Sequence, residues 1–224
     1  MSTPPDYRAC LLDALGTTVR LLPPWEQVDR ALIDGLPPDQ VRAAFRAEMS
    51  FYAAHAHEAT GAGRLAELRE RCAALLASGL DRPVSVEQLM GSIAFAAYED
   101  AAPALAELRG LGLRLVCVSN WDSELQLVLE RIGLAERFDG VVASALAGAR
   151  KPDPAIFEEA LRLAGCAASE AIHVGDTSED VEGARAAGIE VLRIEREGGG
   201  DITTLAEIAP RLRRTAAIGE DPRR

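Results

Sequence analysis

Six side chains able to carry out polar chemistry stand at or soon after the ends of short apolar segments. They are Asp13, Ser119, Asn120, Lys151, Asp176 and Asp180. The carboxyl ends of parallel strands meet at one edge of a sheet, which is where open α/β sheets bind ligands. If the apolar segments are parallel strands, the sequence predicts carboxylates, a hydroxyl and an ammonium gathered around a single point.

Three of these residues, Asp13, Asp176 and Asp180, carry carboxylates that would repel one another unless a cation lay among them. A set of oxygen ligands predicts Mg²⁺, which keeps several of its waters and leaves room for a phosphate. Simpler interpretations exist for single residues. Ser119 and Asn120 have the types that cap helices, and Asp180 has the type that favours the first turn of a helix.

Lys151 is the only lysine in the chain, and arginine supplies every other basic side chain. An arginine-rich composition by itself indicates a GC-rich genome. Against that background, a lone lysine indicates a position that needs a compact ammonium rather than a planar guanidinium.

The composition limits the classes of partner. The chain has 224 residues, 48% of them hydrophobic, which is enough for one large domain or a core with a smaller insert. Its net charge of −11 argues against nucleic acid or an anionic membrane as the main partner. A local site can still oppose this charge and bind a small anionic molecule.

The cysteines and the apolar runs predict a cytoplasmic protein. The four cysteines lie far apart in the sequence and form no CxxC pair, as expected of reduced thiols. The N-terminus does not resemble a signal peptide, and no apolar run is long enough to cross a membrane. We expect either a monomer or a homodimer.

The second half of the chain alternates between strand and helix patterns. Near-continuous apolar strands in such an alternation indicate a parallel sheet with helices on both faces, and therefore an α/β fold. Strands are predicted over residues 8–12, 113–118, 141–144, 171–174 and 190–194. Helices are predicted over residues 103–109, 123–132, 154–164, 179–187 and 203–213.

Residues 19–99 show apolar side chains at helical spacing and no convincing strand. Proline and glycine residues separate the segments, and Ser85 predicts the N-cap of the last one. The predicted helices lie near residues 25–36, 37–52, 65–79 and 85–98. We therefore expect a helical insert at 19–99, an α/β core formed by 1–18 and 100–214, and a mobile tail at 215–224.

Four motifs in a fixed order resemble the haloacid dehalogenase superfamily. They are Asp13-Ala-Leu-Gly-Thr, Ser119-Asn120, Lys151-Pro-Asp-Pro and Gly175-Asp176-x-x-x-Asp180. The helical insert is similar to the C1 cap of subfamily IA, and the sequences Ser-Asn-Trp-Asp and His-Val-Gly-Asp are similar to its REG-2-like branch. The resemblance implies a Rossmann-like core with an inserted α-helical cap.

The resemblance also implies roles in catalysis. Asp13 would be the nucleophile and form an aspartyl phosphate. Ser119 would hydrogen-bond a phosphoryl oxygen, and Lys151 would neutralise the charge between the nucleophile and the phosphoryl group. Thr17 and Asn120 would contribute to binding the substrate.

A magnesium site is implied by the same resemblance. Asp176 would bind Mg²⁺ together with Asp13 and the backbone carbonyl of Leu15. Asp180 would be either a further ligand or the residue that orients Lys151.

The chain departs from the family pattern at Leu15. Phosphatases of the family carry an aspartate there, two residues after the nucleophile, as general acid and base. Leucine cannot transfer a proton, and its presence should cost about 10²–10⁴ in rate.

Three hypotheses remain. The first is a slow or specialised Mg²⁺-dependent phosphohydrolase acting on a small phosphorylated metabolite. The second is a 2-haloacid dehalogenase, whose family also lacks the second aspartate but does not need metal-binding acids. The third is a non-catalytic binding or regulatory protein. A phosphonatase is disfavoured, because that mechanism uses a cap lysine and this cap has none.

The cap is expected to choose the substrate. Its polar candidates to line the cleft are Arg42, Arg46, His55, His57 and Arg64, each of which could instead lie on a solvated helix face. Trp121 is a candidate to pack between core and cap.

Overall fold

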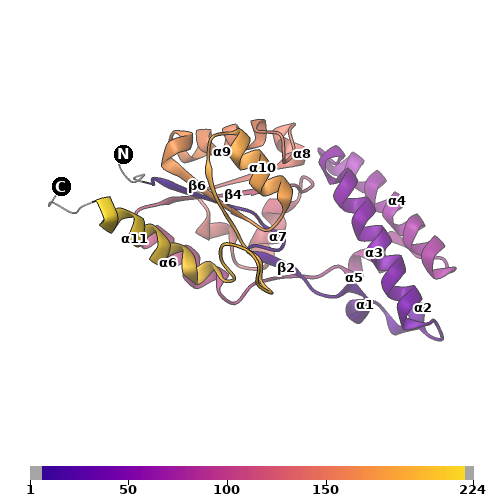
Figure 1. Ribbon diagram of the computed structural model, residues 1–224. Helices are drawn as coiled ribbons and strands as arrows, with labels where there is room; N and C mark the ends of the chain where they lie inside the picture. Colours follow the sequence, from indigo (N-terminus) through magenta and orange to yellow (C-terminus); the bar gives the residue numbers. More distant parts are fainter. Residues whose placement is uncertain (1–6, 220–224) are drawn as a thin grey trace.

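The computed structural model describes residues 7–219, whose centre is a five-stranded parallel sheet (Figure 1). Its strands, in spatial order, are β5 (Gly140–Ala143), β4 (Arg114–Ser119), β1 (Ala9–Leu12), β6 (Ala171–Gly175) and β7 (Glu190–Arg193). All neighbouring pairs in this sheet run parallel. The predicted α/β fold is confirmed, and the central strand β1 ends directly before Asp13.

Helices cover both faces of the sheet (Figure 1). One face is covered by α6 (Ala101–Gly110), α7 (Leu125–Arg131) and α11 (Ile208–Gly219), and the other by α9 (Ala155–Ala164) and α10 (Ser178–Ala186). The short helix α8 (Ser144–Ala147) and the 3₁₀ turns η2 (Ala135–Arg137), η3 (Ala168–Glu170) and η4 (Leu205–Glu207) complete this part.

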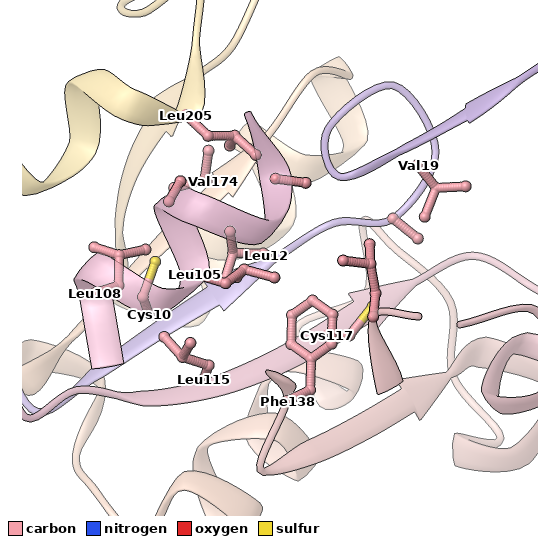
Figure 2. Close-up of a cluster of buried hydrophobic side chains, with 14 of the residues drawn as sticks. Cys10, Leu12, Val19, Leu105, Leu108, Leu115, Cys117, Phe138, Val174 and Leu205 are labelled. Carbon is pink, nitrogen blue, oxygen red and sulfur yellow. The ribbon is translucent and has the colours of Figure 1, made fainter. Parts of the chain in front are cut away.

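Alternate side chains of the central strand β1 pack on opposite faces of the sheet. Cys10 and Leu12 pack into the cluster beneath α6, together with Leu115 and Cys117 of β4 (Figure 2). Ala9 and Leu11 point the other way, into the cluster beneath α9 and α10. Because both faces are covered, every residue of β1 is buried, and the strand is apolar throughout.

The cap is a separate helical unit with its own apolar core. It contains α1 (Pro24–Gln27), α2 (Arg30–Ile33), α3 (Pro38–His55), η1 (Ala56–Glu58), α4 (Ala62–Leu80) and α5 (Val86–Ser92). The long helices α3 and α4 lie side by side (Figure 1) and bury Phe45, Leu65, Leu68 and Leu76 between them and their neighbours. Ser85 caps α5 through a capping box with Gln88, as the sequence indicated.

The prediction that residues 19–99 contain no strand was wrong. Strands β2 (Val19–Leu21) and β3 (Phe95–Ala97) pair antiparallel where the chain enters and leaves the cap. The helix expected over 85–98 therefore ends at Ser92. A strand of three residues is too short to show a recognisable alternation of apolar and polar side chains. These two strands are stabilised by their pairing with each other.

The helix expected near 25–36 is instead two short helices. The side chain of Asp29 accepts a hydrogen bond from the backbone N–H of Ala31 at 2.9 Å and so begins α2 as a new helix. Asp is a strong N-cap residue, and it interrupts the apolar spacing that suggested one continuous helix.

Strands β2 and β3 form a two-stranded stem between the core and the cap. The predicted boundaries at 19 and 99 assign both of these strands to the cap. In the structure, Val19, Phe95 and Ala97 pack with the cluster of the α/β core.

Helix α11 extends through Gly219, so the predicted mobile tail at 215–224 overlaps this helix. Residues 220–224 lie outside the described residues.

The cysteines are free thiols, with Cys10, Cys72 and Cys117 buried. Among the helices of residues 7–219, none combines the length and the apolar character needed to cross a membrane.

Candidate active site

The side chains predicted to meet at one edge of the sheet do so. Asp13 follows β1, and its Oδ1 accepts hydrogen bonds from Ser119 Oγ at 2.9 Å and from Lys151 Nζ at 2.5 Å. All three residues are buried. Asp13 is thus a carboxylate held by a hydroxyl and an ammonium, in the arrangement that a positioned nucleophile requires.

Asp180 is held at both of its carboxylate oxygens. Its Oδ1 accepts from Lys151 Nζ at 2.6 Å and lies 2.8 Å from His173 Nε2. Its Oδ2 accepts from the backbone N–H of Thr177 at 3.1 Å and from the Thr177 hydroxyl at 2.6 Å. Asp180 therefore contacts the Lys151 ammonium and also completes the capping box of helix α10, so it lies in the first turn of a helix, as one interpretation of the sequence expected.

Asp176 has a buried oxygen without a partner. Oxygen atoms of Asp13, Asp176 and Asp180 all lie within 4.8 Å of one another. Asp176 Oδ1 is buried and accepts no hydrogen bond from the part of the chain that the structure describes. An unpaired buried carboxylate oxygen is costly, and a hard cation is the partner that an all-oxygen set favours. These residues therefore fit Mg²⁺.

The electrostatics of the cluster indicate a deficit of positive charge. Burial raises the pKa of Asp13 to about 6, against the opposing effect of Lys151. Burial and the charge of Asp180 raise the pKa of Asp176. Burial alone would lower the pKa of Lys151, but the carboxylates of Asp13 and Asp180 outweigh it and raise that pKa. One ammonium thus faces three carboxylates, and a cation would relieve their mutual repulsion.

Burial would likewise raise the pKa of Asp180, but Lys151 and His173 outweigh it and hold that pKa far below its usual range. Asp180 is accordingly a carboxylate in the folded protein.

Gly175, at the end of β6, leaves the space in which Asp180 sits. A Cβ at this position would lie 2.2 Å from Asp180 Cγ. We expect Gly175→Ala to displace the Asp180 carboxylate from Lys151 and to destabilise the fold by about 1–3 kcal/mol, as overpacking usually does. The measurement is the free energy of unfolding in urea.

Gly110→Ala is the matched control, because a Cβ at Gly110 meets no atom within 4 Å. It should leave stability unchanged or raise it, since alanine restricts the unfolded chain. Equal stability of the two variants would show that Asp180 can move without cost.

The family described as haloacid dehalogenase-like hydrolase matches residues 7–188. The chain belongs to this family. Haloacid dehalogenase-like hydrolase domain-containing protein 3 of Homo sapiens is 48% identical over 92 residues, which cover 41% of this chain and 37% of that protein.

Two further relatives of this haloacid dehalogenase-like hydrolase differ in their named activities. Phosphoserine phosphatase of Thermus thermophilus is 42% identical over 101 residues, covering 44% of this chain and 41% of that protein. The solved structure of L-2-haloacid dehalogenase from Xanthobacter autotrophicus has a TM-score of 0.68 at 21% identity, covering 93% of this chain and 98% of the other. The structural likeness supports the shared fold, and the chain spans less than half the length of the two curated relatives from Homo sapiens and Thermus thermophilus.

Asn120 and Thr17, which were expected to bind substrate, have other contacts in this hydrolase. The Asn120 amide donates to the backbone carbonyl of Lys151 at 3.0 Å and accepts from its N–H at 2.8 Å. It also donates to Glu179 at 3.1 Å. Asn120 thus holds the backbone of Lys151 through both its carbonyl and its N–H. Thr17 is fully buried, and its backbone carbonyl accepts from Arg196 at 2.5 Å. Their predicted contacts with substrate stay predictions.

Leu15 lies in the turn that follows Asp13. Gly16, with φ of +86°, donates its N–H to the carbonyl of Val19 at 2.8 Å and so closes that turn. Leu15 is 42% exposed and is one of a few large apolar residues of the described chain that face solvent. The position at which the family phosphatases were expected to carry an aspartate is thus an accessible apolar residue two positions after Asp13.

The cap docks on the loop that follows β4, a contact that the sequence did not reveal. Tyr52 of α3 donates its hydroxyl to Asp122 at 2.8 Å, and the backbone N–H of Ser123 donates to the carbonyl of Ala59 at 3.1 Å. Arg69 of α4 pairs with Glu124 at 2.5 Å. Because this loop directly follows Ser119, the last residue of β4, the cap is anchored close to the Ser119 side chain.

The polar candidates of the cap fall into two groups. Arg42, Arg46 and Arg64 are exposed, as the alternative of a solvated helix face implies. His55 stacks on the Phe51 ring at 4.1 Å, and His57 is half-buried with a buried Nδ1.

Trp121 packs in the core cluster, where its ring lies 5.0 Å from that of Phe95. It therefore joins the α/β core to the strand that leaves the cap, close to the place expected from the sequence.

Proposed function

We propose that this protein is a Mg²⁺-dependent phosphohydrolase that acts on a small phosphorylated metabolite through an aspartyl phosphate at Asp13. The observation that carries the proposal is the unpartnered Asp176 oxygen beside a nucleophile already held by Ser119 and Lys151. A dehalogenase of this family does not need a metal-binding acid, whereas Asp176 Oδ1 has no other partner among the described residues. The similarity to phosphoserine phosphatase of Thermus thermophilus supports the same class of substrate.

In the first step, a carboxylate oxygen of Asp13 attacks phosphorus while the bond from phosphorus to the leaving oxygen breaks. Lys151 Nζ, within 2.5 Å of Asp13 Oδ1, offsets negative charge between the carboxylate and the incoming phosphoryl group. Ser119 donates to the same oxygen and is placed to donate to a phosphoryl oxygen instead when substrate arrives.

In the second step, a water oxygen attacks phosphorus and the bond from phosphorus to Asp13 breaks, which restores the carboxylate and releases phosphate. Neither step has a proton donor or acceptor at position 15, because that residue is leucine. We therefore expect turnover to be slow with ordinary phosphate esters.

Asp13, Asp176 and the backbone carbonyl of Leu15 would hold the Mg²⁺ ion. When bound, the ion would stabilise the negative charge of the transferring phosphoryl group. Asp180 has four hydrogen bonds on its two oxygens, which favours the role of orienting Lys151 over that of a direct ligand.

The class of reaction can be tested by measuring phosphate release from a panel of phosphate esters and halide release from 2-haloacids, with Mg²⁺ or with EDTA. The proposal predicts phosphate release that requires Mg²⁺. Halide release in EDTA would contradict it and support a dehalogenase. Release of neither product from broad panels would support a binding protein.

Mg²⁺ should also stabilise the fold, because a ligand that binds only the folded state shifts the unfolding equilibrium. At 100 times its dissociation constant the stabilisation is about 2.7 kcal/mol. For a chain of this size that corresponds to roughly 5–10 °C in the thermal midpoint. Thermal unfolding with Mg²⁺ or EDTA measures this shift.

Asp176→Asn should remove most of the Mg²⁺ shift without lowering the midpoint in EDTA. A carboxyl whose pKa is raised on folding destabilises the folded state at neutral pH, and the amide removes that cost. Asp39→Asn is the control, since the Asp39 side chain is 99% exposed on the cap. A Mg²⁺ shift that survives Asp176→Asn would contradict the proposed site.

A further inference from the structure

His173 lies beneath the catalytic cluster, in the interior of the sheet. It belongs to β6 and is fully buried. Its Nε2 lies 2.8 Å from Asp180 Oδ1, and the edge of its ring meets Phe157 at a centroid distance of 4.9 Å. Its Nδ1 is buried and has no hydrogen-bond partner in residues 7–219. His173 thus has one polar contact, and that contact is with the residue that orients Lys151.

The surroundings of His173 decide which nitrogen carries the proton. Asp180 can only accept at Oδ1, because Lys151 Nζ already donates to this oxygen at 2.6 Å. Nε2 must therefore be the donor toward Asp180. Nδ1 is buried without an acceptor among the described residues, so a proton on that nitrogen would be left without a partner.

We infer that His173 is a positioning residue for the proposed phosphohydrolase, which acts through Asp180 on Lys151. It forms the last link of a buried series that runs from His173 Nε2 to Asp180, from Asp180 to Lys151 Nζ, and from Lys151 to Asp13. This inference rests on the proposed function.

The geometry explains why this link matters. Thr177 holds only the Oδ2 side of the Asp180 carboxylate. Without His173, the Oδ1 side would be held by Lys151 alone, through a flexible four-carbon side chain. The carboxylate could then rotate about its Oδ2 contacts, and the ammonium would no longer be fixed against Asp13. His173 therefore fixes the lysine in the position that the phosphoryl group requires.

The proton position can be measured on the wild-type protein by long-range ¹H–¹⁵N NMR. The chain has three histidines, and His173→Gln identifies the signals of His173 by their loss. We expect a ring with its proton on Nε2. A ring with its proton on Nδ1 alone would overturn the inference. This measurement needs no activity, so it is decided even if the proposed function fails.

The consequence for catalysis can be measured with p-nitrophenyl phosphate. His173→Leu removes the donor and is expected to lower kcat by about 10–100-fold, the scale of an outer-shell partner, with little change in KM. His173→Gln places an amide N–H near the position of Nε2 and should restore most of kcat.

Phe157→Leu is the matched control, because it removes the packing against the same ring and leaves the donor to Asp180. It should lower the thermal midpoint and keep kcat. The inference is overturned if His173→Leu folds with unchanged kcat, if His173→Gln loses as much as His173→Leu, or if Phe157→Leu lowers kcat equally. Should His173→Leu not fold, the comparison of His173→Gln with Phe157→Leu and the NMR measurement still decide the matter.

Discussion

Replacing Asp13 by Asn is expected to lower kcat for phosphate release by about 10⁶-fold, the scale on which a hydrolase loses rate when its nucleophile is removed. The amide has the same shape as the carboxylate but cannot form the aspartyl phosphate, so the covalent route through residue 13 is closed. The measurement is phosphate release under saturating p-nitrophenyl phosphate and Mg²⁺.

The variant should remain folded. Lys151 keeps Asp180 as a partner at 2.6 Å, so its buried ammonium is still paired. Asn also removes a buried carboxyl whose pKa is raised on folding. Asp39→Asn, on the exposed face of the cap, should retain wild-type turnover. Turnover by a folded Asp13→Asn comparable to that of the wild type would exclude Asp13 as the nucleophile.

The sequence was sufficient to predict which side chains meet in the site. Asp13, Ser119, Lys151 and Asp180 come from different parts of the chain, but each lies at or beyond the carboxyl end of a strand of the parallel sheet. Such strands all end at the same edge. The convergence is therefore a property of strand order and direction, which apolar patterns reveal.

The sequence did not reveal which atoms pair within the site. Asn120 has the residue type of a substrate ligand, yet it clamps the backbone of Lys151 because the two loops come within 2.8 Å of each other. The role of His173 likewise depends on a distance between β6 and α10. Among these contacts, only the one between Thr177 and Asp180 has a recognisable local sequence pattern, which is the spacing of a capping box.

The stem and the docking of the cap were missed for a related reason. Strands β2 and β3 have three residues each and lie more than seventy residues apart in sequence. The contact of Tyr52 with Asp122 joins the cap to a core loop. Both features depend on contacts between residues far apart in the sequence, and neither produces a periodic pattern of apolar residues in the local sequence.

Leu15→Asp is expected to raise turnover, by up to about 10²–10⁴-fold, because it supplies the general acid and base that this chain lacks. The exposure of Leu15 makes the change tolerable, since 42% of the residue's accessible surface already faces solvent. The new carboxylate would have to act in two steps, as acid toward the leaving oxygen and as base toward the attacking water. Its absence should slow both steps, but unequally.

The wild type should therefore prefer activated phosphates. A good leaving group such as p-nitrophenolate departs without a proton, so the first step is fast, whereas the second still lacks its base. The aspartyl phosphate should then accumulate and give a burst of p-nitrophenolate close to one equivalent per active site. In Leu15→Asp the burst should shrink, and hydrolysis of alkyl phosphates should gain more than that of p-nitrophenyl phosphate.

Leu15→Asn separates proton transfer from the change in polarity, because it has the size of aspartate but cannot exchange a proton at neutral pH. It should keep the burst and the slow turnover of the wild type. The explanation fails if the wild type hydrolyses alkyl phosphates rapidly without a burst. It also fails if Leu15→Asp folds, binds Mg²⁺ and gains no more than Leu15→Asn, because the missing carboxylate would then not be what limits this active site.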